Sequence, residues 1–333
     1  MELNKKKNSN VALVERIMNK RGCKRSSCRV YASTLRKINS EFSNKNFHAN
    51  LKWLESDAPG ILAKIKKLQN VNKQRNFVSS ILVGLSVLDD KKQREVYNVY
   101  LKELNKKKAE LQRSGVMTSK EKAKFVPFKE IIKLRRLLSR EVNLARLYNR
   151  ATVTKKDFLT IQRHFIISLL TYLPPVRNDY ADVKIMTAKE FSAAEGKGKN
   201  ILVTARGGYK FYWRNYKTAG AYGQVVIFIP KYSKPMQRLI VKHVKYLRKH
   251  FPENNALLLN QNFGPLSRNA YTKYLQRMFK VYFKKNVSTT AIRQSFLTAR
   301  YDKKALEEQE DTARAMGHST ATQRRDYVKQ VDS

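Results

Sequence analysis

The chain has 333 residues, long enough for two domains of ordinary size, and its apolar share of 42% excludes a disordered chain. Its 69 Lys and Arg residues against 26 Asp and Glu residues give a formal net charge of +43, with 30 basic and 12 acidic residues in 1–130 and 39 and 14 in 131–333. Both halves are therefore basic and need a polyanionic partner, and charge alone does not separate DNA, RNA and anionic membranes.

The first residues, MELNKKKNSN, are polar and do not resemble a secretory signal. Cys23 and Cys28 are the only cysteines, and no histidine or further cysteine lies close enough in the sequence to complete a zinc-like set. The longest apolar runs, such as 165–173, are too short to cross a bilayer. We therefore expect an intracellular protein of the cytoplasm or nucleus, with two reduced thiols, no metal site and no membrane partner.

Amphipathic helices account for most of the chain between residues 10 and 112. Asn10 can cap the first of them, and Asp89 or Asp90 can open a long last one. Pro59 suits the first turn of a short helix, because proline lacks the N–H that the first turn leaves unused. We predict an all-helical domain over residues 1–112, whose outward positions are mostly Lys and Arg.

A polar, basic stretch containing Ser114 and Gly115 follows, and we predict a linker over residues 113–125. Helices return over residues 126–333, but the apolar period changes in the middle of this region. Three stretches there are rich in β-branched and aromatic residues, namely Ile201–Ala205, Lys210–Tyr216 and Gln224–Ile229. The expected fold class is mainly α with a small antiparallel β-sheet.

Cleaving a phosphodiester without a metal has fixed chemical requirements. A nucleophile must stand in line with the leaving oxygen, cations must neutralise the charge that develops on the non-bridging oxygens, and a proton must reach the leaving oxygen. Arginine suits the clamp because its planar fork binds two phosphate oxygens and keeps its charge. A covalent phosphotyrosine would store the bond energy, so that rejoining needs no ATP.

The C-terminal half holds residues of these types in a defined order. Arg177 stands in LPPVRNDYADV after an apolar helix, Lys217 stands in NYKTAGAYGQVVIFIP at the turn of a predicted hairpin, and Arg293 stands in TTAIRQSF. The segment MGHSTATQRRDY then places His318 nine residues before Tyr327. From about residue 126 to residue 333, this ordered set resembles the active site of the tyrosine recombinases, a family that includes the phage integrases.

The resemblance implies a role for each residue of the set. Arg177 and Arg293 would clamp the scissile phosphate, and Lys217 would protonate the leaving 5′-oxygen. His318 would assist at the phosphate, and Tyr327 would attack it and hold a 3′-phosphotyrosine intermediate. The resemblance also implies a DNA-gripping helical domain over residues 1–112, a catalytic domain over residues 126–333, double-stranded DNA as partner, a homotetramer on two DNA sites, and no metal or other cofactor.

Two positions depart from the family pattern. Thr290 stands where the family has a histidine; a threonine hydroxyl can donate a hydrogen bond to a phosphate oxygen but cannot carry a proton between pH 5 and pH 8. Tyr180 stands three residues after the first arginine, where the family often has an acidic residue. Asp179 or Asp182 is then the candidate for orienting that arginine. Only six residues follow Tyr327, whereas many family members end in a helix that docks on a neighbouring subunit.

The expected function is site-specific DNA recombination, such as the integration or excision of a viral or mobile element. A type IB topoisomerase shares the phosphate chemistry but works as a monomer. Thr290 also leaves open a non-catalytic DNA-binding protein on a decayed recombinase scaffold, and the charge alone would also suit an RNA-binding protein. For the proton donor, Arg206, Lys210 and Arg214 lie on the same predicted hairpin as Lys217.

Overall fold

A computed structural model describes residues 2–43, 45–113, 117–193, 198–316 and 320. The chain divides into two compact units, Met1–Val116 and Met117–Ser333, which are described separately. The boundary between the units lies within the stretch 113–125 that we expected to be a linker. That stretch contains a short helix, α6 (Ser119–Lys122), whose first turn is closed by a capping box between Thr118 and Glu121.

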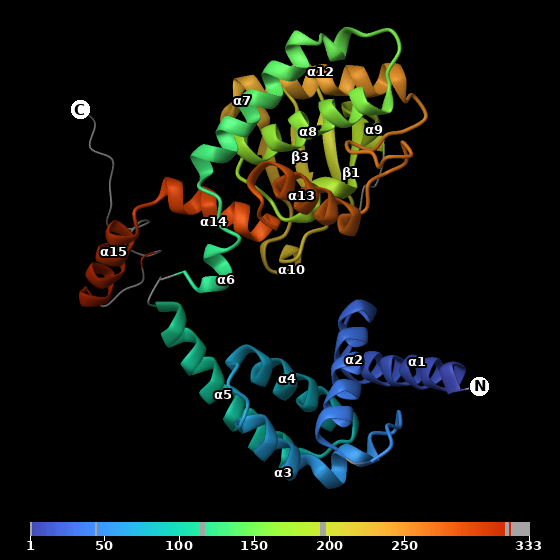
Figure 1. Cartoon of the computed structure of the whole chain (residues 1–333), viewed down its shortest axis with the longest axis vertical. Helices are drawn as coiled ribbons and strands as arrows, with labels where there is room; N and C mark the ends of the chain where they lie inside the picture. Colours follow the sequence, from blue (N-terminus) through green and yellow to red (C-terminus); the bar gives the residue numbers. More distant parts are fainter. Residues whose placement is uncertain (1, 44, 114–116, 194–197, 317–319, 321–333) are drawn as a thin grey trace. The chain divides into compact units, whose positions relative to one another are not determined.

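The first unit is all helical in the part of the chain that the structure describes (Figure 1). Its helices are α1 (Glu2–Arg21), α2 (Arg25–Phe42), α3 (Lys52–Lys66), α4 (Val71–Val87) and α5 (Lys91–Arg113). Their apolar stripes meet in one core, which includes Leu35 and Ile81 without exposed surface and continues to Tyr97 on α5. The tyrosine hydroxyl donates to the carbonyl of Ala58 at 2.6 Å, which satisfies its polar end inside that core.

Three details of the first unit differ from expectation. Helix α1 begins at Glu2, so Asn10 lies inside the helix rather than at its cap. Cys23 and Cys28 are joined by a disulfide bond, where we expected two reduced thiols; their Cα atoms lie 6.5 Å apart across the turn between α1 and α2, within reach of such a bond. Pro59 lies inside α3 rather than in its first turn. The helix begins at Lys52 because Trp53, 3% exposed, already belongs to the core and extends the helix toward the N-terminus.

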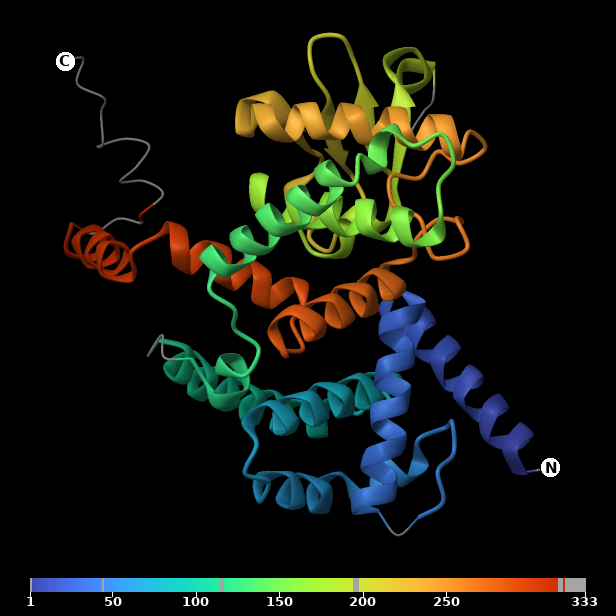
Figure 2. The ribbon, with the colours of Figure 1, turned by 45° about the horizontal axis from the view of Figure 1, so that its top comes forward.

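In the second unit, helices surround a small sheet (Figures 1 and 2). The helices that precede the sheet are α6, α7 (Phe128–Leu144), the 3-10 turn η1 (Leu147–Asn149), α8 (Lys155–Tyr172) and the 3-10 turn η2 (Asn178–Asp182). Those within it and after it are α9 (Ala188–Ala193), α10 (Ala219–Tyr222), α11 (Ile229–Tyr232), α12 (Lys234–His250), α13 (Arg268–Phe283), α14 (Thr289–Arg300) and α15 (Lys303–Ala315). Helix α8 is buried over most of its length and packs against α7 and α12.

The sheet contains four strands in the order β1-β2-β3-β4. They are β1 (Val183–Thr187), β2 (Asn200–Thr204), β3 (Lys210–Trp213) and β4 (Val225–Phe228). The three predicted strands correspond to β2, β3 and β4, which pair antiparallel as expected. β1 was not predicted and pairs parallel to β2, so the sheet is mixed rather than purely antiparallel.

The parallel pair has a physical reason in the connection between its strands. After β1 the chain crosses back through α9 before β2 begins, and parallel strands need such a crossover. The mainly helical fold class with a small sheet is confirmed. None of the helices in the described part of the chain is both long enough and apolar enough to cross a membrane.

Candidate active site

Arg177 lies at the point where the buried helix α8 gives way to the sheet. Helix α8 ends at Tyr172, and the next residue, Leu173, is extended because the proline that follows it disfavours helical backbone. Arg177 then precedes the first residue of η2 and is half-buried. The prolines thus set the arginine at a chain reversal on the rim of the core rather than on a solvated helix face.

Arg293 projects from α14, one turn after the start of that helix. The hydroxyl of Ser288 caps the helix by accepting the backbone N–H of Ala291 at 3.4 Å. The Arg293 side chain is half-buried, and its burial lowers the pKa of the guanidinium. The neighbouring positive charge of Arg177 lowers this pKa further, and Asp179 opposes both effects. The two arginines that the sequence singled out are therefore close enough to repel each other.

Asp179 is the carboxylate nearest to this arginine pair, and it is 7% exposed. Burial raises its pKa, the charges of Arg268 and Arg177 oppose that rise, and the charge of Asp182 adds to it. The backbone of Arg177 also lowers the pKa of the Asp179 carboxyl. Asp179, one of the two candidates for orienting the first arginine, therefore lies beside Arg177.

Arg268, in the first turn of α13, joins both carboxylates of η2. Its guanidinium lies 3.4 Å from Asp179 and 2.9 Å from Asp182. It also donates to the backbone carbonyl of Asn215. Arg268 therefore takes up the charge of the two aspartates, so that neither is paired with Arg177 or Arg293 through an ion pair in the described residues.

A second set of hydrogen bonds ties η2 to the start of α14. The Asn178 amide donates to the Thr272 hydroxyl at 2.8 Å and accepts from the Thr289 hydroxyl at 3.1 Å. Thr289 is the first residue of α14 and is buried. Because Asn178 follows Arg177 and Thr289 precedes Arg293 by about one turn, this link holds the two arginine-bearing segments together.

Lys217 lies on the connection between β3 and β4, the hairpin turn where the sequence predicted it, and its side chain is exposed. Asn200, the first residue of β2, secures the start of this connection and has no exposed surface. Its amide nitrogen donates to the carbonyl of Asn215 at 3.0 Å, and its amide oxygen accepts the backbone N–H groups of Arg214 and Asn215 at 3.0 and 2.9 Å. The Asn200 side chain therefore holds the backbone at Asn215, two residues before Lys217, in place.

The same amide reaches the segment that carries the first arginine. The Asn200 side-chain nitrogen lies 3.1 Å from the Asp182 carboxylate and 3.5 Å from the Asp179 carbonyl. One buried side chain thus couples the end of η2 to the connection after β3. Together with Asn178, it links the three segments that bear Arg177, Lys217 and Arg293.

Thr290, which the resemblance places at the phosphate, is exposed and lies one helical turn before Arg293. Residues three apart on a helix share a face, so its hydroxyl is on the side of Arg293. Of the two adjacent threonines, Thr289 is the buried one. His318 and Tyr327 lie outside the described residues.

Three residues that support the site were not predicted from the sequence, namely Asn200, Thr289 and Arg268. Arg268 carried one signal, because a cation in the first turn of a helix opposes the helix dipole and requires a nearby anion. Asn200 and Thr289 carried none, since their partners are 14 to 111 residues away along the chain.

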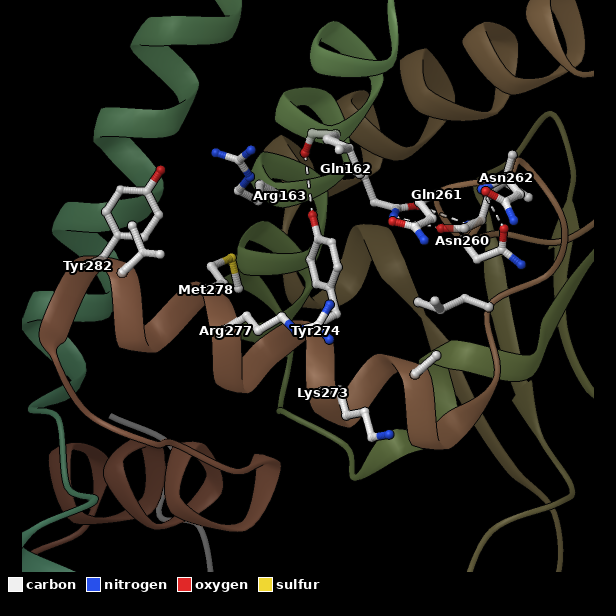
Figure 3. Close-up of a pocket in the computed structure, with 15 residues that line it drawn as sticks. Gln162, Arg163, Asn260, Gln261, Asn262, Lys273, Tyr274, Arg277, Met278 and Tyr282 are labelled. Atoms are coloured by element: carbon white, nitrogen blue, oxygen red, sulfur yellow. Dashed lines mark hydrogen bonds between the residues drawn. The ribbon is translucent and has the colours of Figure 1, made fainter.

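Another hollow of the second unit, with a volume of about 730 Å³, lies between α8, α13 and residues 259–262. Figure 3 shows Tyr274 directed from α13 toward α8, where its hydroxyl donates to the carbonyl of Leu159 at 3.4 Å. Burial raises the pKa of Tyr274 to about 12. Tyr274 is on the opposite face of α13 from Thr272, and neither Arg177 nor Arg293 lines this hollow, so it is separate from the arginine pair.

The chemistry open to the arginine pair follows from its charges. Two half-buried guanidinium groups without an ion-paired carboxylate present a fixed positive field suited to a tetrahedral anion, above all a phosphate group. Among the described residues, no group of three His, Cys, Asp or Glu side chains is arranged to hold a metal ion. The exposed Lys217 adds a third cation on a separate, tethered loop.

Comparisons with known proteins give limited information. No model of a known protein family matches the chain, and no curated protein matches it. Among solved structures, a crystal structure of XerA recombinase is similar at 13% sequence identity and a TM-score of 0.33, with 97% of this chain and 94% of that chain covered. A likeness at this level establishes neither a common fold nor a common activity.

Proposed function

We propose that the chain is a DNA strand-cutting and rejoining enzyme of the tyrosine recombinase type. The observation that carries the proposal is the half-buried pair Arg177 and Arg293, with the nearby carboxylates taken up by Arg268. An uncompensated pair of this kind is costly unless an anion binds to it. The net charge of +43 favours nucleic acid as the source of that anion.

In the proposed mechanism, the arginine forks hold the non-bridging oxygens of the scissile phosphate. Tyr327 attacks phosphorus, its hydroxyl proton is lost, and the bond to the 5′-oxygen of the leaving strand breaks. Lys217 gives that oxygen a proton, which leaves a 3′-phosphotyrosine and a free 5′-hydroxyl. His318 and Thr290 assist by donating hydrogen bonds to the phosphate. Attack by another 5′-hydroxyl reverses the step and releases Tyr327, so no metal or ATP is required.

The substrate is double-stranded DNA, and four protomers assemble on two DNA sites, because recombination cuts each site on both strands. Site-specific recombination of a viral or mobile element is the role we assign. A type IB topoisomerase would run the same chemistry as a monomer, so the mass of the protein–DNA complex in gel filtration separates the two.

The test is covalent trapping on a nicked suicide duplex, from which the cleaved fragment diffuses away. The wild-type chain is expected to form an adduct that maps to Tyr327 and persists in EDTA, while Tyr327→Phe forms none and still binds DNA. Tyr301→Phe, which changes an exposed tyrosine of the described part, is the matched control and should react as wild type. Wild type that binds DNA without forming any adduct would support the non-catalytic alternative, and an adduct on another residue would overturn the assignment.

A further inference from the structure

A second group of cations surrounds a groove formed by α7, α8 and α12, which we call the α7–α12 groove. It consists of two hollows of about 370 and 440 Å³ that share Ser139, Asn143, His164 and Tyr172 in their walls. Five cations line it, namely Arg135, Arg136 and Arg140 on α7 and Arg238 and Lys242 on α12. None of the residues proposed for catalysis belongs to it.

Within the described parts of the chain, the cations of this groove have no carboxylate partner. Neither hollow has an Asp or Glu in its wall, and none of the five cations forms an ion pair within the residues that the structure describes. Elsewhere on the same helix α7, Lys133 does pair with Glu130 at 2.9 Å. The groove therefore concentrates positive charge in a concave space, where like charges repel and a bound anion relieves the repulsion.

Arg135 is held in place at one end of the groove. Its guanidinium lies over the ring of Tyr172, 3.7 Å from the ring centre, and donates to the Thr171 hydroxyl at 3.2 Å. Burial lowers the pKa of Arg135, and Arg136 beside it contributes in the same direction. An arginine stacked in this way is pre-oriented, so it loses little conformational freedom when its fork binds an anion.

His164 supplies an independent sign of a ligand. The residue is 6% exposed and lies in the walls of both hollows, and its buried Nδ1 atom has no hydrogen-bond partner. Burial, together with the charges of Arg135 and Lys242, lowers its pKa to about 4, so the ring is neutral at pH 7. A buried polar atom without a partner is uncommon in proteins and is satisfied here when Nδ1 donates its proton to an anion.

We propose that the α7–α12 groove binds a compact ligand that carries two or more phosphate groups. Several phosphates are required because five cations border the groove, and arginine forks match phosphate oxygens. Hollows of this size fit a small molecule. Duplex DNA presents its phosphates on a convex surface; it would touch the rim cations Arg136, Arg140 and Arg238 but would not use His164.

The probe for the test is inorganic tripolyphosphate, titrated into the full chain by calorimetry. The arginine pair of the candidate active site also attracts phosphate, so all titrations use the Arg177→Gln, Arg293→Gln background. Binding in that background no longer includes the arginine pair, so the result does not depend on whether the proposed function is correct.

Three variants in that background decide the outcome. Replacing both α12 cations, Arg238→Gln with Lys242→Gln, should weaken tripolyphosphate binding at least tenfold. His164→Leu should weaken it about threefold or more while leaving the affinity for a 20-base-pair duplex unchanged. The matched control, Lys245→Gln, removes a cation from α12 outside the groove and should change binding less than twofold.

Four results would overturn the proposal. They are no tripolyphosphate binding in the background protein, an equal loss with Lys245→Gln, an unchanged affinity in the Arg238→Gln, Lys242→Gln variant, and binding by His164→Leu equal to that of the background. The first result combined with weakened duplex binding by the α12 variant would assign the rim cations to the DNA backbone instead. If His164→Leu fails to fold, which circular dichroism detects, the α12 double variant and its control still decide the proposal.

Discussion

Both units bury side-chain amides, and two of these, Gln74 and Asn200, have different roles. Gln74 in the first unit is 7% exposed and donates to the carbonyls of Ile65, Lys66 and Leu68, all within nine residues of it. It satisfies the carbonyls left open at the end of α3. Asn200 in the second unit forms hydrogen bonds with residues 14 to 21 positions away and so holds two irregular segments together. A local cap stabilises a helix end, whereas the long-range amide holds candidate site residues in place.

The cations of the two units also differ, in whether they form ion pairs with acidic side chains. In the first unit several exposed cations have acidic partners, as in the pairs Lys20–Asp89 and Lys45–Asp57. In the second unit Arg177 and Arg293 are half-buried, and neither forms an ion pair with a carboxylate among the described residues. A composition that is basic in both halves thus yields a solvated, partly neutralised surface in one unit and, in the other, an arginine pair for which we propose an anionic ligand. The comparison predicts that equivalent substitutions have unequal consequences.

The largest expected effect concerns the arginines. Arg177→Ala or Arg293→Ala should each reduce the cleavage rate on the suicide duplex by at least a hundredfold to a thousandfold, because a donor to developing charge is worth about 3–4 kcal/mol. Arg25→Ala in the first unit removes an exposed arginine paired with Glu15 and should leave the rate within about threefold. Single-turnover cleavage measures all three. Equal losses in the two units would mean that both arginine types act only through general affinity for DNA.

The buried amides come next. Asn200→Ala leaves two backbone N–H groups and a carboxylate oxygen without their partner, and we expect the free energy of unfolding to fall by about 3 kcal/mol, with a loss of cleavage under folding conditions. Gln74→Ala should cost about 2 kcal/mol and leave cleavage unchanged. Urea unfolding measures the free energy of unfolding, and cleavage at low temperature measures activity under conditions where the variants are folded. Normal cleavage by folded Asn200→Ala would show that the tether has no part in activity.

Buried histidines give the units a different response to acid. Burial lowers the pKa of His164 to about 4 and that of His243 to about 3, below the unfolded value of about 6.5. Between these values the unfolded chain binds protons that the folded chain does not, so stability falls as pH falls from about 6.5 toward 4. Each histidine should contribute about 2 kcal/mol of this loss between pH 7 and pH 5.

Urea unfolding at the two pH values tests this prediction. The loss between pH 7 and pH 5 should be smaller by about 2 kcal/mol in His164→Gln than in wild type. His48→Gln, which changes an exposed histidine of the first unit, should keep the wild-type loss. An unchanged pH dependence in His164→Gln would show that His164 titrates normally in the folded protein.

The smallest expected effect distinguishes two hydroxyls that differ in their partners. Thr289→Val removes the hydrogen bond to Asn178 and should cost about 1 kcal/mol in the free energy of unfolding, with some loss of cleavage because Asn178 links the arginine segments. Ser80→Ala in the first unit removes a buried hydroxyl that donates only to the carbonyl of Asn76, and should cost a similar amount without affecting cleavage. Reduced cleavage in Ser80→Ala would contradict the prediction that only the hydroxyl in the second unit supports activity.

Much of the helical architecture could be predicted because amphipathic periodicity is a local property. The change of period around residues 200–229 likewise located three of the four strands. β1 was missed because it is five residues long and pairs in parallel with a strand beyond a helical crossover, a feature without a local signal. The same limit applies to the disulfide between Cys23 and Cys28, where spacing alone did not distinguish a bond from two thiols.

By itself, the sequence determined the mainly helical character, the positions of most elements and the excess of positive charge, all of which depend on neighbouring residues and composition. It also singled out Arg177 and Arg293 by their order along the chain. Only the tertiary structure decided that these arginines lie close together, that Arg268 takes up the nearby carboxylates, and that Asn200 fastens the loop before Lys217. Such pairings join residues far apart in the chain, and their strength depends on burial, which only the packed core creates.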